Sequence, residues 1–150
     1  MAKSRVRAAI DFGISNTDAI AEVNGELRRW TEPYDGDPNP DEVRRILAKG
    51  GVDLETLPQL AVTGGRHKML PTNIGNCEVI SVNEVNAIGR GGRAMAGLVG
   101  NQARKPVLVI SAGSGTAIIA ARSNGIRHVS GTAVGGGTML GLSRLLLDTA

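Results

Sequence analysis

The stretch PVLVISAGSGTAIIAARSNGIRHVSGTAVGGGTMLGLSRLLLDTA, residues 106–150, decides the fold. Its first apolar run, residues 107–110, lies between a proline and a glycine and predicts a buried strand. A second apolar run, residues 117–121, leads to Asn124-Gly125, which favours a hairpin because both residues tolerate positive φ. A returning strand over residues 126–130 and a helix after Gly137 complete the predicted unit.

Two glycine turns interrupt this pattern. One joins the first two strands at Gly113-Ser114-Gly115-Thr116, and the other enters the helix at Gly135-Gly136-Gly137-Thr138. Small residues leave backbone N–H groups exposed, and a helix start favours negative charge, so both turns predict contact with phosphate. Thr116 and Thr138 would add hydroxyl donors. A lone glycine turn is more often only a tight turn, but two turns joined by one hairpin favour a nucleotide-phosphate site.

This stretch resembles the second phosphate motif of the type II pantothenate kinases, the eukaryotic-like or Fumble family. The resemblance rests on three segments: GSGTAII at 113–119, RHVSGT at 127–132 and VGGGTMLGLSRLLL at 134–147. These kinases belong to the actin, hexokinase and Hsp70 ATPase superfamily. The resemblance implies an α/β fold of the ribonuclease H-like kind, which is the actin-like ATPase fold, with a mixed sheet.

Composition excludes several classes of function. The formal charge of +3 is mild, and the arginines are not interleaved with aromatic residues, so nucleic acid is not expected as a partner. A single cysteine, Cys77, excludes an internal disulfide and fits a reducing compartment. The sequence shows no signal peptide and no membrane span, so a cytoplasmic protein without a membrane partner is expected.

The beginning of the chain predicts an antiparallel meander of three strands. Residues 6–10 and 19–23 have apolar β patterns, and Asn24-Gly25 turns the chain into a third run over residues 26–30. The turn between the first two strands is polar and contains Asp11 near the end of the first run. Taken alone, an ordinary turn capped by Asp and Asn explains this segment equally well.

In the resembled superfamily this first turn carries the first phosphate motif, usually Asp-x-Gly-Gly-Thr. Asp11 would then hold Mg²⁺ through water, as carboxylates usually do. The donors to ATP would come from the turn: Gly13, Ser15, Asn16 and Thr17. The sequence departs from the motif at Ile14, where a second glycine is usual, and at Asp18, where these kinases commonly have lysine. The pair Thr17-Asp18 instead resembles the hydantoinase and oxoprolinase branch.

The middle of the chain predicts scaffold. Asn39 and Pro40 are a good N-cap and first position for a helix, which Gly50-Gly51 would end. Residues 60–63 predict a strand closed by two glycines. His67 follows without a Cys, His or carboxylate at metal-ligand spacing, so we expect a surface histidine.

A catalytic base is predicted at the start of a glycine-rich helix, after a strand over residues 78–82. In the resembled kinases the catalytic glutamate stands there in an Asp/Asn-Glu pair, and Asn83-Glu84 matches it. Such a helix start can bring the carboxylate to the hydroxyl that it deprotonates. The alternatives are a surface carboxylate favoured by the helix dipole and a base at Glu78.

The resemblance implies ATP-dependent phosphorylation of a small hydroxyl compound, pantothenate, to 4'-phosphopantothenate in coenzyme A biosynthesis, with ATP and Mg²⁺ as cofactors. Ser114 stands where the family contacts both nucleotide and pantothenate. The family usually has a substrate-binding arginine immediately before the segment VSGT. Here His128 occupies that position, beside Arg127.

The resembled kinases continue with a second half of the cleft, so residues 1–150 are expected to form one actin-like ATPase subdomain carrying both phosphate motifs. Three functions stay open: a kinase completed by the second half, a non-catalytic or partner-completed nucleotide-binding module, and a hydantoinase- or activator-type ATPase. The last helix is more apolar than one face requires. A homo-oligomer or a completing chain is therefore expected to cover it.

Overall fold

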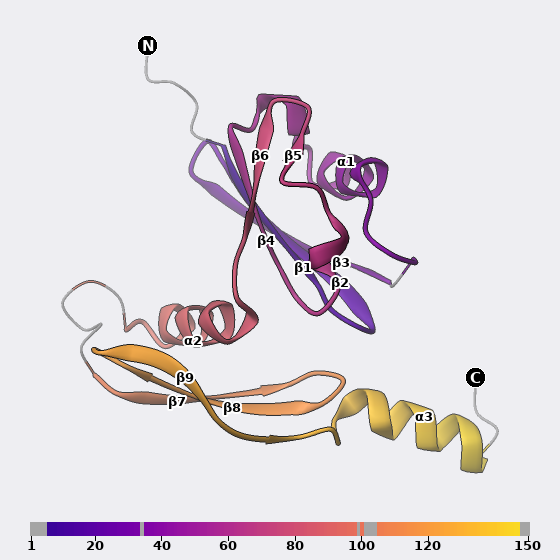
Figure 1. Cartoon of the computed structure of the whole chain (residues 1–150), viewed down its shortest axis with the longest axis vertical. Helices are drawn as coiled ribbons and strands as arrows, with labels where there is room; N and C mark the ends of the chain where they lie inside the picture. The colour runs from indigo at the N-terminus through magenta and orange to yellow at the C-terminus, as the bar shows by residue number, and fades with distance from the viewer. Residues whose placement is uncertain (1–5, 34, 99, 101–104, 148–150) are drawn as a thin grey trace. The chain divides into compact units, whose positions relative to one another are not determined.

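The computed structural model describes residues 6–33, 35–98, 100 and 105–147. The chain divides into two compact units, unit 1 over residues 1–83 and unit 2 over residues 84–150. Unit 1 contains a six-stranded sheet and unit 2 a three-stranded sheet (Figure 1). The single ATPase subdomain expected from the sequence stays a prediction.

The sheet of unit 1 is mixed, with the order β3-β2-β1-β4-β6-β5. Its strands are β1 (Arg7–Phe12), β2 (Asn16–Val23), β3 (Glu26–Pro33), β4 (Gln59–Thr63), β5 (Asn73–Ile74) and β6 (Cys77–Ser81). Strands β1, β2 and β3 pair antiparallel, while β4 pairs parallel with both β1 and β6. This arrangement confirms the predicted α/β class and the antiparallel meander at the start of the chain.

Helix α1 (Pro40–Lys49) covers one face of this sheet (Figure 1). It begins as predicted, because the Asn39 side chain accepts hydrogen bonds from the N–H groups of Asp41 and Glu42. Two short 3-10 helices, η1 (Leu54–Thr56) and η2 (His67–Met69), lie in the connections. The core of unit 1 is made of fully buried residues from α1 and the strands, among them Ile10, Phe12, Val43, Ile46, Leu47, Leu60 and Val62.

Trp30, the only tryptophan of the chain, hydrogen bonds from β3 to α1. Trp30 Nε1 donates a hydrogen bond to the Ile46 carbonyl at 3.0 Å. Gly50 follows the helix, and a methyl group placed on it would lie 2.2 Å from the Trp30 ring. A glycine is therefore required where α1 ends against the indole.

Unit 2 is a three-stranded antiparallel sheet covered on one face by a helix. The strands are β7 (Val107–Ala112), β8 (Thr116–Arg122) and β9 (Gly125–Thr132), and the helix is α2 (Glu84–Met95). A methyl group on Gly89 would lie 2.4 Å from Ile126 Cγ2, and one on Gly92 would lie 2.5 Å from Val109 Cγ1. The glycines thus allow α2 to approach the sheet closely, which explains why a glycine-rich helix forms here.

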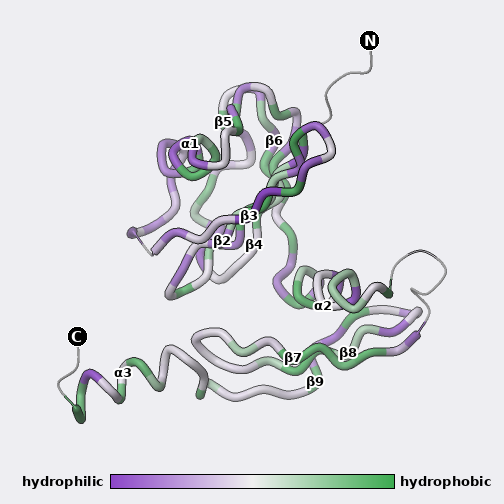
Figure 2. Tube along the Cα trace, turned by 180° about the vertical axis from the view of Figure 1, so that it is seen from behind, coloured by the Kyte–Doolittle hydropathy of each residue, from purple (hydrophilic) through white to green (hydrophobic). Residues whose placement is uncertain are grey.

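Helix α3 (Gly136–Leu147) follows β9 and has no buried residue. Its hydrophobic side chains are largely exposed, Leu145 at 79% and Leu146 at 72%. Figure 2 shows hydrophobic residues, in green, along α3. None of the helices in the described residues has the length and apolar character of a membrane span.

Candidate functional site

The first predicted phosphate turn connects β1 to β2 in unit 1. Phe12 pairs with Thr17, so the turn is shorter than expected and β2 already begins at Asn16. A methyl group on Gly13 would lie 2.8 Å from the Asn16 carbonyl oxygen, so the turn requires glycine there. Ser15 is exposed like Asn16, but Thr17 is fully buried, and its predicted role as a donor to phosphate stays a prediction.

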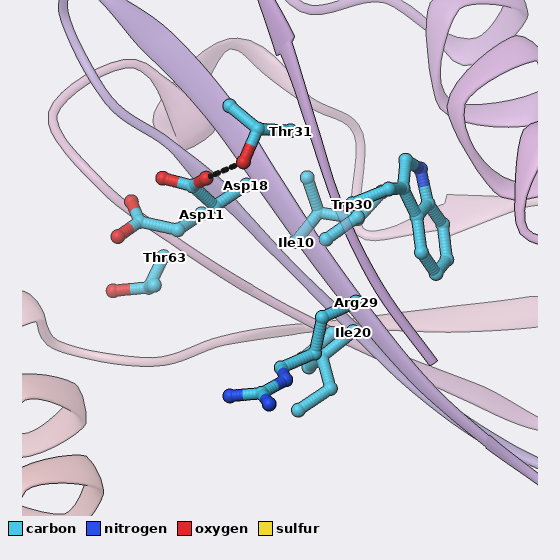
Figure 3. Close-up of a pocket in the computed structure, with 10 residues that line it drawn as sticks. Ile10, Asp11, Asp18, Ile20, Arg29, Trp30, Thr31 and Thr63 are labelled. Atoms are coloured by element: carbon cyan, nitrogen blue, oxygen red, sulfur yellow. Dashed lines mark hydrogen bonds between the residues drawn. The ribbon is translucent and has the colours of Figure 1, made fainter. Parts of the chain in front are cut away.

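Asp11 belongs to a row of four polar residues that crosses the sheet on the face opposite α1. The register aligns Thr31 on β3 with Asp18 on β2, Asp18 with Asp11 on β1, and Asp11 with Thr63 on β4. Thr31 Oγ1 donates to Asp18 Oδ1 at 2.6 Å. All four line a cavity of about 540 Å³, and Figure 3 shows them beside one another.

The chemistry of this row fits a magnesium ion. Like charges directly opposite one another on neighbouring strands are destabilising, and Asp11 and Asp18 are such a pair. The Thr63 hydroxyl oxygen is buried without a hydrogen-bond partner among the described residues. Mg²⁺ prefers oxygen ligands and is usually held by one or two carboxylates together with waters and phosphates. Such a site requires no larger cluster, and the described residues contain no group of three or more His, Cys, Asp or Glu that could hold a metal.

The turn after β4 supports the end of β1. Gly64 has a φ of +89°, a conformation that favours glycine. The next residues include His67, which is only 7% exposed, so the prediction of a surface histidine is wrong. Its Nδ1 lies 2.5 Å from the Gly64 carbonyl oxygen and its Nε2 lies 2.6 Å from Ser81 Oγ. Because a carbonyl can only accept, Nδ1 carries a proton, and in the neutral ring Nε2 accepts from the Ser81 hydroxyl.

The two glycine turns of unit 2, the β7–β8 turn and the turn that enters α3, lie against each other. A methyl group on Gly135 would lie 2.7 Å from the Gly113 carbonyl oxygen and 2.8 Å from Gly115 Cα. One on Gly137 would lie 3.1 Å from Ser114 Cβ. The structure therefore brings together the β7–β8 turn and the start of α3, backbone against backbone.

Several N–H groups of these turns already have partners. Gly113 N–H donates to the Gly115 carbonyl, and Gly136 N–H donates to the Gly113 carbonyl, both at 2.8 Å. Gly135 N–H donates to Thr138 Oγ1 at 3.3 Å. The expectation of exposed, unbonded N–H groups is therefore wrong at these three positions.

The two threonines also hydrogen bond within the protein. Thr116 Oγ1 donates to the Val134 carbonyl at 2.9 Å, and Thr138 Oγ1 donates to the Ala133 carbonyl at 3.0 Å. Each hydroxyl has one proton, so the Thr116 proton joins the β7–β8 turn to the segment before α3, and the Thr138 proton stays within the connection between β9 and α3. The predicted donation from Thr116 and Thr138 to phosphate stays a prediction.

The two candidate substrate residues lie on opposite faces of β9. His128 pairs with Ile119 and Arg127 pairs with Ala120. Successive residues of a strand point to opposite faces, and Ile119 lies beneath Gly89 of α2. His128 is therefore on the face that α2 covers, and Arg127 is on the other.

Glu84 is the first residue of α2 and is exposed, in agreement with a carboxylate at a helix start. It belongs to unit 2, whereas Glu78 belongs to β6 in unit 1. Gln59 Nε2 donates to Glu78 Oε2 at 2.7 Å, which gives the rival base a structural partner.

The side chain of Arg66 reaches the first phosphate turn, a contact that the sequence does not predict. Arg66 Nε donates to the Gly13 carbonyl at 2.9 Å across 53 residues of sequence. The sequence indicates only that a positively charged side chain follows Gly64-Gly65. It does not show which part of the protein that side chain contacts.

Solved structures with similar backbones share the fold but little sequence. The activator of the 2-hydroxyisocaproyl-CoA dehydratase from Clostridium difficile, with bound ADPNP, is 12% identical with a TM-score of 0.61, over 97% of this chain and 53% of that one. The ethanolamine utilization protein EutJ from Carboxydothermus hydrogenoformans is 14% identical with a TM-score of 0.55, over 96% and 57%. The polyphosphate/ATP-glucomannokinase from Arthrobacter sp. strain KM is 18% identical with a TM-score of 0.50, over 83% and 61%.

These likenesses confirm the predicted ribonuclease H-like, actin-like ATPase fold. The chain spans a little more than half the length of the first of these structures. No curated protein matches the chain in sequence. The family model described as Fumble matches residues 68–150, which is more than half of the chain. The chain therefore belongs to the Fumble family, the type II pantothenate kinases.

Proposed function

We propose that this protein binds Mg-ATP at its glycine turns and transfers the terminal phosphoryl group to the hydroxyl of a small compound, pantothenate. The observation that carries the proposal is the contact between the β7–β8 turn and the start of α3, where Gly135 lies against Gly113. Phosphoryl transfer depends mainly on positioning and on neutralising charge. Two closely packed glycine turns, one of them at a helix start, would meet the first requirement. Family membership supports the choice of reaction.

Asp11 would hold the magnesium ion through water, with Asp18 and the Thr63 hydroxyl on the same face of the sheet. When bound, Mg²⁺ neutralises the charge of the phosphate oxygens. The β1–β2 turn, with Gly13, Ser15 and Asn16, would contact phosphate in unit 1. Ser114, in the β7–β8 turn, would contact nucleotide and pantothenate in unit 2.

Glu84 would act as the general base. Its carboxylate would accept the proton of the substrate hydroxyl as that oxygen attacks the phosphorus. The side chain is exposed at the start of α2. Glu78 already accepts a hydrogen bond from Gln59, which makes it the weaker candidate.

The choice of pantothenate rests on family membership. Arg127 and His128 lie on opposite faces of β9, so a ligand held against one face would contact one of them directly. With 4'-phosphopantothenate as its product the protein would act in coenzyme A biosynthesis, and we propose the cytoplasm as its compartment.

The deciding experiment measures ADP release with and without pantothenate, on this chain and on a longer form containing a second half of the cleft. Release that depends on pantothenate supports the kinase. Release that is independent of it favours a hydantoinase- or activator-type ATPase, and nucleotide binding without release favours a non-catalytic or partner-completed module.

A further inference from the structure

We infer that Arg66 is the positioning residue of the first phosphate turn: its guanidinium fixes the β1–β2 turn in the conformation that receives phosphate. This inference rests on the proposed function, and it assigns a role to a residue outside the glycine motifs. Arg66 would act through the backbone of the turn.

The main chain of Arg66 already lies against the end of β1. Its N–H donates to the Phe12 carbonyl at 3.4 Å. Two residues earlier, Gly64 lies so close to Phe12 that a methyl group on it would be 2.5 Å from the Phe12 carbonyl oxygen. The turn after β4 is thus fixed at the point where β1 ends, and Arg66 leaves it toward the phosphate turn.

The guanidinium then joins both ends of that turn. Nε donates to the Gly13 carbonyl at 2.9 Å, and Nη2 donates to Thr17 Oγ1 at 3.4 Å. Nη1 donates to the Gly36 carbonyl in the connection between β3 and α1. One planar group therefore binds three acceptors in two segments, the β1–β2 turn and the β3–α1 connection, which lie 30 to 53 residues away in sequence.

The contact with Gly13 sets the direction of the next N–H group. In a trans peptide the carbonyl of one residue and the N–H of the next lie in one plane and point in opposite directions. The described residues contain no cis peptide bond. Because the Gly13 carbonyl points at Arg66, the Ile14 N–H points away from it. The guanidinium thereby orients a backbone donor of the turn and adds a permanent positive charge beside it.

Lysine can supply this charge but cannot supply the planar arrangement of donors. The inference is tested with Arg66→Lys and Arg66→Ala, and with Arg44→Ala as the matched control. Arg44 is another arginine of unit 1, paired on the surface with Asp41 and Glu55. Two readouts are needed: amide hydrogen exchange over residues 13–17 without nucleotide, and the affinity for Mg-ATP by calorimetry.

Both Arg66 variants are expected to exchange the turn amides faster and to bind Mg-ATP about 10- to 100-fold more weakly, the range that hydrogen bonds to charged groups contribute. Free guanidinium ion should restore part of the affinity to Arg66→Ala. Arg44→Ala should match the wild type in both measurements. Wild-type exchange and wild-type affinity in Arg66→Lys would overturn the inference, because charge alone would then suffice.

The lysine variant keeps the charge and the aliphatic part of the side chain, so it decides the question even if the alanine variant fails to fold. If the wild type binds no Mg-ATP, the proposed function fails, but hydrogen exchange still measures whether Arg66 orders the turn. Unchanged exchange in the lysine variant would then refute the positioning role by itself.

Discussion

Gly64 lies directly against the carboxylate of Asp11: a methyl group placed on its Cα would be 2.3 Å from Asp11 Oδ1. Asp11 is in β1, Gly64 directly follows β4, the parallel neighbour of β1, and Gly64 has a φ of +89°. The proposed magnesium ligand therefore lies close against the backbone of the turn that follows β4. A side chain at position 64 would displace it.

Gly64→Ala is expected to lower the free energy of unfolding by about 1–3 kcal/mol, because a strained φ and a close contact with Asp11 occur together. Mg-ATP affinity should fall as well, since the carboxylate must move. Urea denaturation and calorimetry measure the two effects. Gly65→Ala is the control, because a methyl group there meets no atom within 4 Å; equal losses in both variants would refute the explanation.

Gly135→Ala is expected to separate the two glycine turns of unit 2. The added methyl group would lie 2.7 Å from the Gly113 carbonyl oxygen, and overpacking of this kind typically costs about 1–3 kcal/mol. Thermal unfolding followed by circular dichroism should show the loss. The comparison is Gly141→Ala in α3, where a methyl group has open space and alanine favours the helix by about 1 kcal/mol. A stable Gly135→Ala protein with wild-type nucleotide affinity would contradict the structure of this site.

Glu84→Gln is expected to reduce turnover by about 10²–10⁴-fold, the usual contribution of a general base, while Mg-ATP affinity stays at the wild-type value. Glutamine keeps the shape of the side chain but accepts no proton. The measurement is pantothenate-dependent ADP release by an active form of the protein. Glu78→Gln should be nearly silent, and the reverse ranking of the two variants would assign the base to Glu78.

Glu42 makes stability depend on pH. Its side chain is 6% exposed, both carboxylate oxygens lack a hydrogen bond among the described residues, and burial raises the pKa of this carboxyl. The folded state thus holds the proton of Glu42 more tightly than the unfolded state does. The stability contributed by protonated Glu42 is therefore present in acid and is lost as pH rises through the raised pKa. Glu42→Gln should therefore raise the melting temperature at neutral pH, with the gain disappearing in acid. An unchanged melting temperature at neutral pH would refute this.

Glu32, in β3, provides the opposite case. The hydrogen bond from Lys49 lowers the pKa of the Glu32 carboxyl, opposed by burial and aided by Arg45. Its contribution to stability is present above the ordinary pKa of a glutamate and lost as pH falls through the lowered one. Glu32→Gln should lower the melting temperature at neutral pH, so the two glutamine variants are expected to differ in sign.

Association in solution is expected from α3. Its exposed leucines form an apolar surface of the kind that marks contact sites. Light scattering should give a mass above that of one chain, and Leu145→Glu together with Leu146→Glu should reduce it without unfolding β7–β9. A wild-type chain that stays monomeric at high concentration would contradict the expected homo-oligomer.

The elements that sequence predicts well are those with local causes. The Asn-Gly turns at 24–25 and 124–125 and the Asn39 cap depend on neighbouring residues, and the structure contains the meander, the hairpin and α1. Strand β5, Asn73–Ile74, is missed because two residues carry no period. Thr17 was placed in a turn because of its polar neighbours, but pairing with Phe12 draws it into β2.

The site residues that depend on distant partners are harder to predict. His67 stands between Arg66 and Lys68, which suggests a surface, and its partner Ser81 lies 14 residues away. The sequence also does not show which N–H groups of the glycine turns are available to a ligand. The N–H groups of Gly113 and Gly136 donate to the carbonyls of Gly115 and Gly113 only in the folded hairpin. Sequence locates the turns but not the hydrogen bonds inside them.

The indole of Trp30 is a fluorescent group within unit 1. It is the chain's single tryptophan, it lies in unit 1, and it donates to the Ile46 carbonyl of α1. Release of α1 would expose the ring to water and change its emission, so this emission follows the unfolding of unit 1. Tryptophan fluorescence and far-ultraviolet circular dichroism, recorded on the same sample, can therefore resolve whether the two units melt together or one after the other.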